Sequence, residues 1–214
     1  MQGNLADVEQ RLRRYWYSDG IGELIGGGMF ILLGLYFALQ EFLGQNSLVS
    51  GILQASLILL MIGGMLISRR LINALKTRLT YPRTGYVEYQ VNEHGMKSRW
   101  VMAAVLGFAV SVLTIVFTRV FLFFDSIVAV TGLIVALILV ILRAKSSGVT
   151  RFYVLGAVAL MLGLVLSVSG LPNGYSLGSF YSLMGVCFVL SGGFTLRRYL
   201  KENPLVTDAE RQNG

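Results

Sequence analysis

Long apolar runs, separated by short polar segments, dominate the hydrophobic pattern of the chain. The runs cover residues 21–43, 48–68, 101–117, 126–142, 152–171 and 177–196. A helix needs about 20 apolar residues to cross the ~30 Å of hydrocarbon in a bilayer, and an uncharged run of this length is typical of a membrane span. The pattern therefore predicts an all-α membrane protein whose six transmembrane helices form three in–out–in hairpins.

The polar segments between the runs define the expected domain organisation. Residues 1–20 are predicted to form an N-terminal interfacial amphipathic helix, 21–68 the first hairpin, 69–100 a cytoplasmic segment, 101–142 the second hairpin, 143–151 a cytoplasmic loop, 152–196 the third hairpin, and 197–214 a cytoplasmic tail that is disordered at its end. Within the 69–100 segment, leucines at four-residue spacing predict that the second helix continues beyond the membrane. The alternating residues 86–91, which lie between turn-like stretches at 82–85 and 92–95, predict a small β-hairpin insert there.

The distribution of charge gives the expected orientation. Charged residues make up 14% of the chain, whereas about a quarter is usual for a soluble domain. Of the 18 Lys and Arg residues, all but Arg119 fall on one side of the predicted topology, and cytoplasmic loops are the ones that retain such residues. We therefore expect a bacterial inner-membrane protein with both termini in the cytoplasm. The same rule explains the net charge of +7, so the expected partners are anionic lipid headgroups and not nucleic acid.

An internal repeat relates the first hairpin to the last. The ungapped shift that aligns Gly27 with Gly156 also aligns Gly34 with Gly163, and it aligns Gly63-Gly64 with Gly192-Gly193. Both copies would run in–out–in, so the two hairpins are predicted to be parallel repeats about an axis normal to the membrane. The residues between them do not align at this shift and would form a divergent middle hairpin.

Glycines recur at a spacing that indicates helix packing. Gly20, Gly27 and Gly34 are seven residues apart, and Gly22-x-x-x-Gly26 is a close-approach motif. Small residues let helix backbones meet inside a membrane, where no hydrophobic effect brings helices together. The candidate packing residues are Gly22, Gly26, Gly27, Gly34, Gly63, Gly64, Gly156, Gly163, Gly192 and Gly193. The sequence leaves open whether this seam meets another span or another subunit.

Few polar side chains lie in or near the predicted spans. Glu23 is a few residues inside the cytoplasmic boundary, where a charge is often functional, and Asp19, just outside the span, would share that functional role. Otherwise Glu23 would reach water or pair with an interfacial arginine. Gln40, Glu41 and Gln54 lie at the outer ends of the first two spans. They predict either an outer vestibule or a polar rim beside a short loop. The candidate ligand or pore residues are Glu23, Gln40, Glu41 and Gln54.

The residues needed for catalysis or metal binding are scarce. The chain has one histidine and one cysteine, and zinc sites and nucleophilic triads need more such groups. Its glycine-rich stretch lies in a predicted span without a preceding strand, which is not the context of a phosphate-binding loop. We therefore expect no catalytic residues, no cofactor, no metal site and no enzymatic activity.

Two strings carry a resemblance to known proteins, namely residues 15–20 (YWYSDG) and residues 78–87 (RLTYPRTGYV). Together they resemble a group of bacterial multi-span integral membrane proteins that have no assigned activity. The resemblance implies a membrane protein and no functional residues. The second string contains the candidate docking residues Tyr81, Pro82, Arg83, Gly85 and Tyr86. These residues predict either a turn that rests on the bilayer or a surface that binds a partner.

Two classes of function fit these patterns. The first is a non-enzymatic accessory, scaffolding or regulatory component that acts through the cytoplasmic 69–100 segment on a membrane or cytoplasmic protein, or that forms a homo-oligomer. The second is a small-solute carrier, channel or substrate-binding subunit with a site between the repeated hairpins, because repeat interfaces often hold such sites. A polar cavity between the hairpins would favour the second class, and a tightly packed bundle would favour the first.

Overall fold

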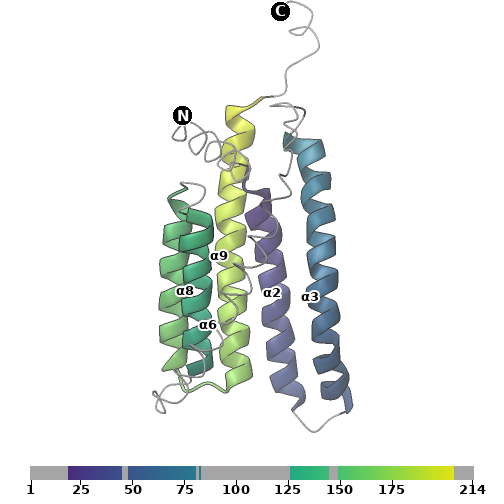
Figure 1. Ribbon diagram of the computed structural model, residues 1–214, viewed down its shortest axis with the longest axis vertical. Helices are drawn as coiled ribbons and strands as arrows, with labels where there is room; N and C mark the ends of the chain where they lie inside the picture. Colours follow the sequence, from purple (N-terminus) through teal and green to yellow (C-terminus); the bar gives the residue numbers. More distant parts are fainter. Residues whose placement is uncertain (1–18, 45–47, 81, 83–125, 145–148, 205–214) are drawn as a thin grey trace, which may run out of the picture.

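The structure is a computed structural model that describes residues 19–44, 48–80, 82, 126–144 and 149–204. The elements within these residues are all helices (Figure 1). They are α2 (Ile21–Leu43), α3 (Leu48–Leu75) with its continuation η1 (Lys76–Thr80), α6 (Ser126–Leu137) with its continuation η2 (Ile138–Ala144), α8 (Arg151–Ser167) and α9 (Asn173–Glu202). The predicted all-helical class is confirmed for this part of the chain.

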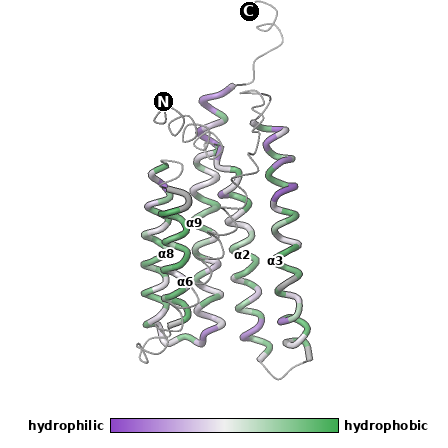
Figure 2. Tube along the Cα trace, viewed as in Figure 1, coloured by the Kyte–Doolittle hydropathy of each residue, from purple (hydrophilic) through white to green (hydrophobic). Residues whose placement is uncertain are grey.

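Three of these helices are long and apolar enough to cross a membrane. They are Ile21–Leu43, Gly51–Thr80 and Asn173–Glu202, and two shorter apolar helices cover Ile127–Ile141 and Arg151–Ser167. Apolar residues fill the middle of each helix, and hydrophilic residues gather at the upper ends of α3 and α9 (Figure 2). The chain is therefore a membrane protein by the length and composition of its helices.

The helices lie side by side, with α9 between α2 and the α6 and α8 helices, and with α3 beyond α2 (Figure 1). α2 and α9 are antiparallel, because Gly20 lies against Gly192 and Glu41 contacts Gly174. α6 and α8 are antiparallel too, since Gly132 lies against Gly163. We call the end that holds Asp19, Lys76 and Arg151 the basic end, and the end that holds Glu41 and Gly174 the far end.

α2 and α9 contact each other backbone to backbone along a line of glycines. A Cβ atom added to Gly27 would lie 2.7 Å from the carbonyl oxygen of Gly185, and one added to Gly185 would lie 2.7 Å from that of Gly27. Gly34 meets Gly178 in the same way, and Gly20 meets Gly192. Seven residues are close to two helical turns, so glycines at this spacing share one face. This line, the glycine seam, therefore joins two helices of the same chain.

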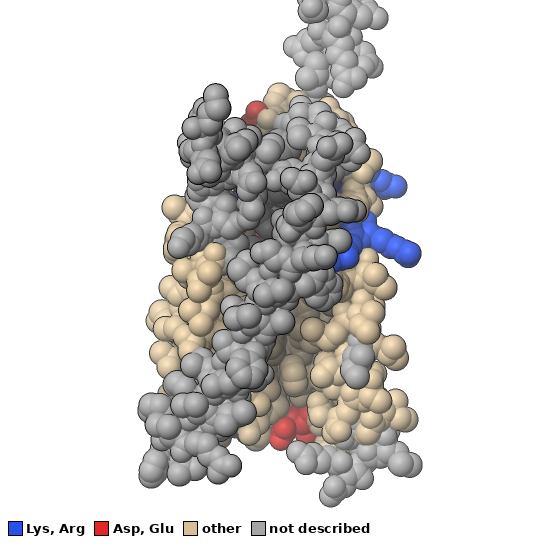
Figure 3. Space-filling view, viewed as in Figure 1, with Lys and Arg blue, Asp and Glu red and all other residues tan. Residues whose placement is uncertain are grey.

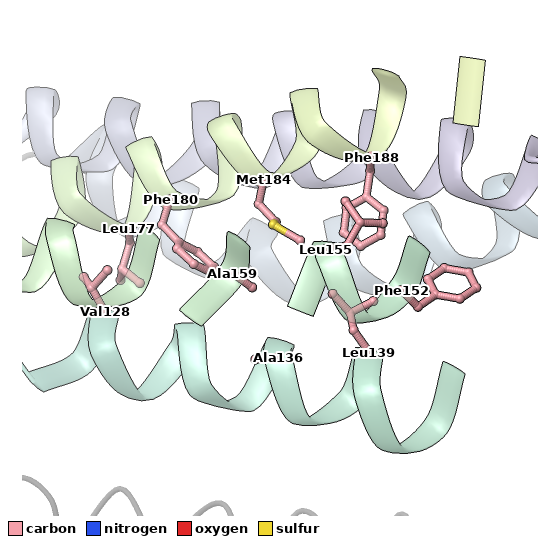
Figure 4. Close-up of a cluster of buried hydrophobic side chains, with 10 residues drawn as sticks. All are labelled: Val128, Ala136, Leu139, Phe152, Leu155, Ala159, Leu177, Phe180, Met184 and Phe188. Carbon is pink, nitrogen blue, oxygen red and sulfur yellow. The ribbon is translucent and has the colours of Figure 1, made fainter. Parts of the chain in front are cut away.

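A second close contact joins α6 and α8. A Cβ added to Gly163 would lie 2.9 Å from the Cα of Gly132, and one added to Gly156 would lie 2.9 Å from a methyl group of Val140. Side chains fill the remaining space between α9, α6 and α8 (Figure 4). The buried cluster consists of Val128, Ala136, Leu139, Phe152, Leu155, Ala159, Leu177, Phe180, Met184 and Phe188.

Other predicted packing glycines do not meet the backbone of another described helix. A Cβ added to Gly22, Gly26, Gly63 or Gly193 would meet nothing within 4 Å among the described residues. One added to Gly64 would meet only the flexible side chain of Met29. For Gly22 and Gly26 the physical reason is helix geometry: at 3.6 residues per turn they point about 140° and about 100° away from Gly27 of the seam.

The helix that begins at Leu48 runs on to Thr80, as the four-residue leucine spacing predicted. Other boundaries differ from the predicted ones, since α9 spans Asn173–Glu202 and so extends past both ends of the predicted run at 177–196. α8 ends at Ser167, four residues before the predicted end of that span, and Gly170 follows with a φ of 69°. A positive φ is readily adopted by glycine and stops a helix. The predicted interfacial helix, the β-hairpin insert and the span at 101–117 lie outside the described residues, apart from Asp19, Gly20 and Pro82.

Candidate functional site: two ion pairs at the basic end

Glu23 forms a buried ion pair with Arg151. The Glu23 Oε1 atom accepts a hydrogen bond from Arg151 Nε at 2.8 Å and lies 2.6 Å from Arg151 Nη2. The second carboxylate oxygen, Oε2, accepts a hydrogen bond from the Ser191 hydroxyl at 2.7 Å. The Glu23 side chain is 4% exposed and that of Arg151 is 25% exposed. The predicted alternative that Glu23 pairs with an arginine at the boundary is the one that the structure presents.

Arg151 also binds α9 directly. Its Nη1 donates to the Thr195 hydroxyl at 2.9 Å, and that hydroxyl donates to the Ser191 carbonyl at 2.8 Å. The guanidinium also lies 5.5 Å from the ring centroid of Phe152, within the range of a cation–π contact. One arginine at the start of α8 therefore binds side chains of both α2 and α9.

Asp19 forms a second buried ion pair, with Lys76. The Lys76 Nζ atom lies 3.1 Å from Asp19 Oδ2, and the two side chains are 5% and 1% exposed. The Thr80 hydroxyl donates to the same oxygen at 3.4 Å, and the Ile21 backbone N–H donates to Asp19 Oδ1 at 3.2 Å. Asp19 thus does not share the Glu23 site. It joins the start of α2 to η1.

Forming a buried ion pair and removing one of its partners have unequal effects on the stability of the fold. A buried ion pair stabilises a fold little compared with well-packed apolar residues, but removal of one partner costs about 3–5 kcal/mol because the other charge stays buried. Each carboxylate here accepts bonds from a cation and from a hydroxyl. The arrangement is suited to holding helices in one position. The described residues include no group of three or more His, Cys, Asp or Glu side chains that could hold a metal ion.

The other predicted ligand residues lie at the far end. Glu41 Oε2 accepts a hydrogen bond from the backbone N–H of Gly174 at 3.2 Å, and a carboxylate is favourable at such a helix start because free N–H groups and the helix dipole point toward it. Gln40 is half-buried and Gln54 is exposed. Glu23 and Glu41 are 18 residues apart on α2, which corresponds to about 27 Å. The structure therefore does not bring the four residues together in one site.

The predicted docking residues fall almost entirely outside the described part of the chain. Pro82 is described and is exposed. Tyr81, Arg83, Gly85 and Tyr86 are not among the described residues, so the docking interpretation stays a prediction.

The partners of the two carboxylates were not predicted from the sequence. Lys76, Arg151, Ser191 and Thr195 were not candidate site residues. A signal existed, because each cation lies near the same predicted membrane boundary as the acids. The signal did not identify the pairs, since Arg151 lies 128 residues after Glu23 and the pairing depends on which helices are neighbours.

In comparisons with known proteins, no family model, no curated protein and no solved structure matches the chain.

Proposed function

We propose that the chain is a six-span protein of the bacterial inner membrane, with both termini in the cytoplasm, that acts as a non-enzymatic scaffold. In this proposal the bundle holds the cytoplasmic 69–100 segment at a fixed place, and that segment binds a membrane or cytoplasmic protein. The observation that carries the proposal is the Asp19–Lys76 ion pair with its Thr80 hydrogen bond. It fixes the last helical turn before residue 81 to the start of α2.

The position of the bilayer is supported by the charges of the described helices. Between Glu23 and Glu41, a rise of about 27 Å, neither α2 nor the neighbouring helices carry a charged residue. This length is close to the ~30 Å of the hydrocarbon core. In Figure 3 the visible Lys and Arg atoms lie in the upper half of the molecule, whereas acidic atoms appear both near its top and near its lower end. The basic end is the cytoplasmic one in this proposal, because Lys and Arg are retained there.

The count of six spans is supported by the directions of the helices. α3 with η1 ends at the basic end, where Lys76 meets Asp19. α6 begins at the far end, because Gly132 lies against Gly163 in the C-terminal half of α8 while Arg151, at the start of α8, lies at the basic end. The intervening residues must therefore return from one end to the other. The apolar run at 101–117 is the segment suited to this crossing.

The repeat remains part of the proposal on the evidence of the sequence. α2 and α8 run in the same direction, as parallel repeats require. The equivalent residues Gly27 and Gly156 both lie at close helix contacts. Their neighbours differ, since Gly27 meets α9 and Gly156 meets α6.

The carrier alternative receives less support from the geometry. A carrier needs a site between the two repeated hairpins. The first of these hairpins contains α2, and the last contains α9. These two helices contact each other backbone to backbone at Gly27–Gly185 and Gly34–Gly178, which leaves no room for a solute along that line. The buried carboxylate of Glu23 is occupied by Arg151 and Ser191.

The orientation is tested by labelling single cysteines in intact cells, with Cys187 replaced by serine. Ser169→Cys places a thiol at the far end and Lys201→Cys places one at the basic end; both positions are exposed. An impermeant maleimide should label the first in intact cells and the second only after the membrane is opened. The reverse pattern would contradict the proposed orientation.

The scaffold role is tested by photo-cross-linking in native membranes. A photoreactive amino acid at position 86 should give one discrete protein adduct, identified by mass spectrometry, and the yield should fall when Asp19→Asn releases the last turn of η1. The matched control is position 59, where Leu59 is 72% exposed on α3 and should give lipid adducts. If position 86 also gives only lipid adducts, the segment rests on the bilayer and the scaffold proposal fails.

A further inference from the structure

Two helix pairs in the bundle are held by contacts between backbones. α2 and α9 meet along the glycine seam, and α6 and α8 meet where Gly132 faces Gly163. Contacts of this kind involve few side chains that can change rotamer, and packed small-residue interfaces change their spacing only by separating. Each pair, α2/α9 and α6/α8, is therefore suited to move as one body.

The interface between the two pairs is made of side chains instead. Phe180, Met184 and Phe188 of α9 pack against residues of α6 and α8 such as Leu155 (Figure 4). Methionine is flexible and adapts to different surroundings. An interface of this kind permits a hinge or shear motion without disturbing the contacts inside each pair.

The two ends of this interface are joined in different ways. At the far end a short connection, residues 168–172, links α8 to α9, and it contains Gly170 with its φ of 69°. At the basic end Arg151 of the α6/α8 pair binds Glu23 and Thr195 of the α2/α9 pair. The first arrangement resembles a hinge, and the second a closure that polar bonds hold shut.

We propose that the Glu23–Arg151 ion pair is a latch that holds the basic end of the bundle closed. When the latch is broken, the α6/α8 pair moves away from the α2/α9 pair about the connection at residues 168–172. This motion opens a water-filled crevice from the basic end, with Glu23, Ser191 and Thr195 at its mouth. The latch is a conformational device that is independent of the scaffold role proposed for the 69–100 segment.

The one cysteine of the chain is a natural reporter of this crevice. Cys187 lies one turn before Ser191 on α9, is partly buried and packs against the cluster between the two pairs. Maleimides react with the thiolate, which forms where water reaches the sulfur. In nanodiscs of phosphatidylcholine and phosphatidylglycerol, Glu23→Gln and Arg151→Gln should each raise the rate of Cys187 modification roughly tenfold, the scale of a typical conformational coupling.

Three matched variants make the measurement specific. The charge-reversed double variant Glu23→Arg/Arg151→Glu should restore part of the slow rate. Arg198→Gln makes the same charge change as Arg151→Gln but breaks an exposed pair with Glu202, and it should leave the rate unchanged. The third variant moves the thiol to the far end as Cys187→Ser/Ser167→Cys, because Ser167 is 5% exposed on α8. This thiol should stay slow when Glu23→Gln is added.

Each contrary outcome overturns the latch. If Cys187 reacts at the native rate in both Glu23→Gln and Arg151→Gln, the ion pair does not close the bundle. If the thiol at position 167 accelerates as much as Cys187, the whole fold has loosened and no hinged opening exists. An equal acceleration in Arg198→Gln would mean that net charge, and not the pair, controls access.

Discussion

α2 and α3 follow one another along the chain and are both apolar enough to span a membrane, yet the bundle buries them differently. In the most apolar stretch of α2, 33% of the residues are buried, whereas in that of α3 the share is 0%. The α3 stretch is the more apolar of the two. Hydrophobicity alone therefore does not determine which membrane helix lies inside the described bundle.

The difference in burial between α2 and α3 follows from the lipid that surrounds the helices. Lipid tails are as apolar as leucine, so an apolar side chain gains little by leaving lipid for another helix. α3 keeps large side chains on its surface, such as Ile52 at 71% and Leu59 at 72% exposure. α2 instead presents Gly27 and Gly34 to α9, where backbones approach closely. Small residues at the right spacing thus make the closest contact of α2, the one with α9.

The largest loss of stability is expected from a substitution at Gly27, which faces α9. Gly27→Leu places a side chain where even a Cβ would lie 2.7 Å from the Gly185 carbonyl oxygen, so α2 and α9 must separate. We expect a loss above about 3 kcal/mol in the free energy of unfolding, at or beyond the upper end for overpacking. Unfolding by added dodecyl sulfate, followed by far-UV circular dichroism, measures this loss.

The matched control is Gly26→Leu, because a Cβ at Gly26 meets nothing within 4 Å among the described residues. It should change the free energy of unfolding by less than about 0.5 kcal/mol. Equal losses in the two variants would mean that the seam is not the contact that distinguishes α2.

Gly156→Leu extends the comparison to the second glycine contact. Here the added Cβ would lie 2.9 Å from a methyl group of Val140, and the far end of a side chain yields more easily than a backbone atom. We expect a smaller loss than for Gly27→Leu, about 2 kcal/mol. The same unfolding measurement tests it, and a loss equal to or larger than that of Gly27→Leu would contradict the order.

Asp19→Asn tests the one described ion pair that fixes α3 to the rest of the bundle. The asparagine keeps a hydrogen-bonding oxygen for Ile21 but removes the negative charge that faces Lys76, whose side chain is 5% exposed. We expect a loss of about 1.5–2 kcal/mol, below the about 3–5 kcal/mol for complete removal of one partner, because asparagine still offers an amide oxygen to the neighbouring donors. The control is Glu202→Gln, whose pair with Arg198 is exposed and contributes little. If the control loses as much stability, burial of the Asp19 pair has no special role.

The smallest effect is expected on α3 itself. Leu59→Ala and Gly63→Leu change positions that face away from the described helices. Each should shift the free energy of unfolding by less than about 0.5 kcal/mol. A loss near 2 kcal/mol in either variant would reveal a protein contact on α3 and would weaken the contrast with α2.

The sequence predicted much of the helical framework. The predicted span at 21–43 coincides with α2, because the apolar run is bounded by Gly20 and by Gly44, both of which adopt a positive φ. The seven-residue spacing of Gly27 and Gly34 indicated a packing face correctly. The motif formed by Gly22 and Gly26 indicated a face without close contacts, because a local motif does not reveal where the neighbouring helix lies.

The candidate site was predictable only in part. Glu23 stood out because it is an acid inside a span, and an arginine partner was one interpretation. The identity of Arg151 depends on α8 lying beside α2 and α9, which is a tertiary fact without a local signal. The prediction that Glu23 shares one site with Gln40, Glu41 and Gln54 was wrong for a different reason. Distance along one straight helix, about 27 Å, separates Glu23 from residues that share its polarity.

The most direct test of the seam between α2 and α9 is a disulfide between the two helices. With Cys187 replaced by serine, Ala38→Cys and Gly178→Cys place thiols at Cβ positions 3.1 Å apart, slightly closer than the Cβ separation of an ordinary disulfide. The account predicts rapid, nearly complete cross-linking in native membranes under mild oxidation, and none for Ala38→Cys with Gly51→Cys, since a Cβ at Gly51 meets nothing within 4 Å among the described residues. Cross-linking of the α3 pair and not of the α9 pair would contradict the account.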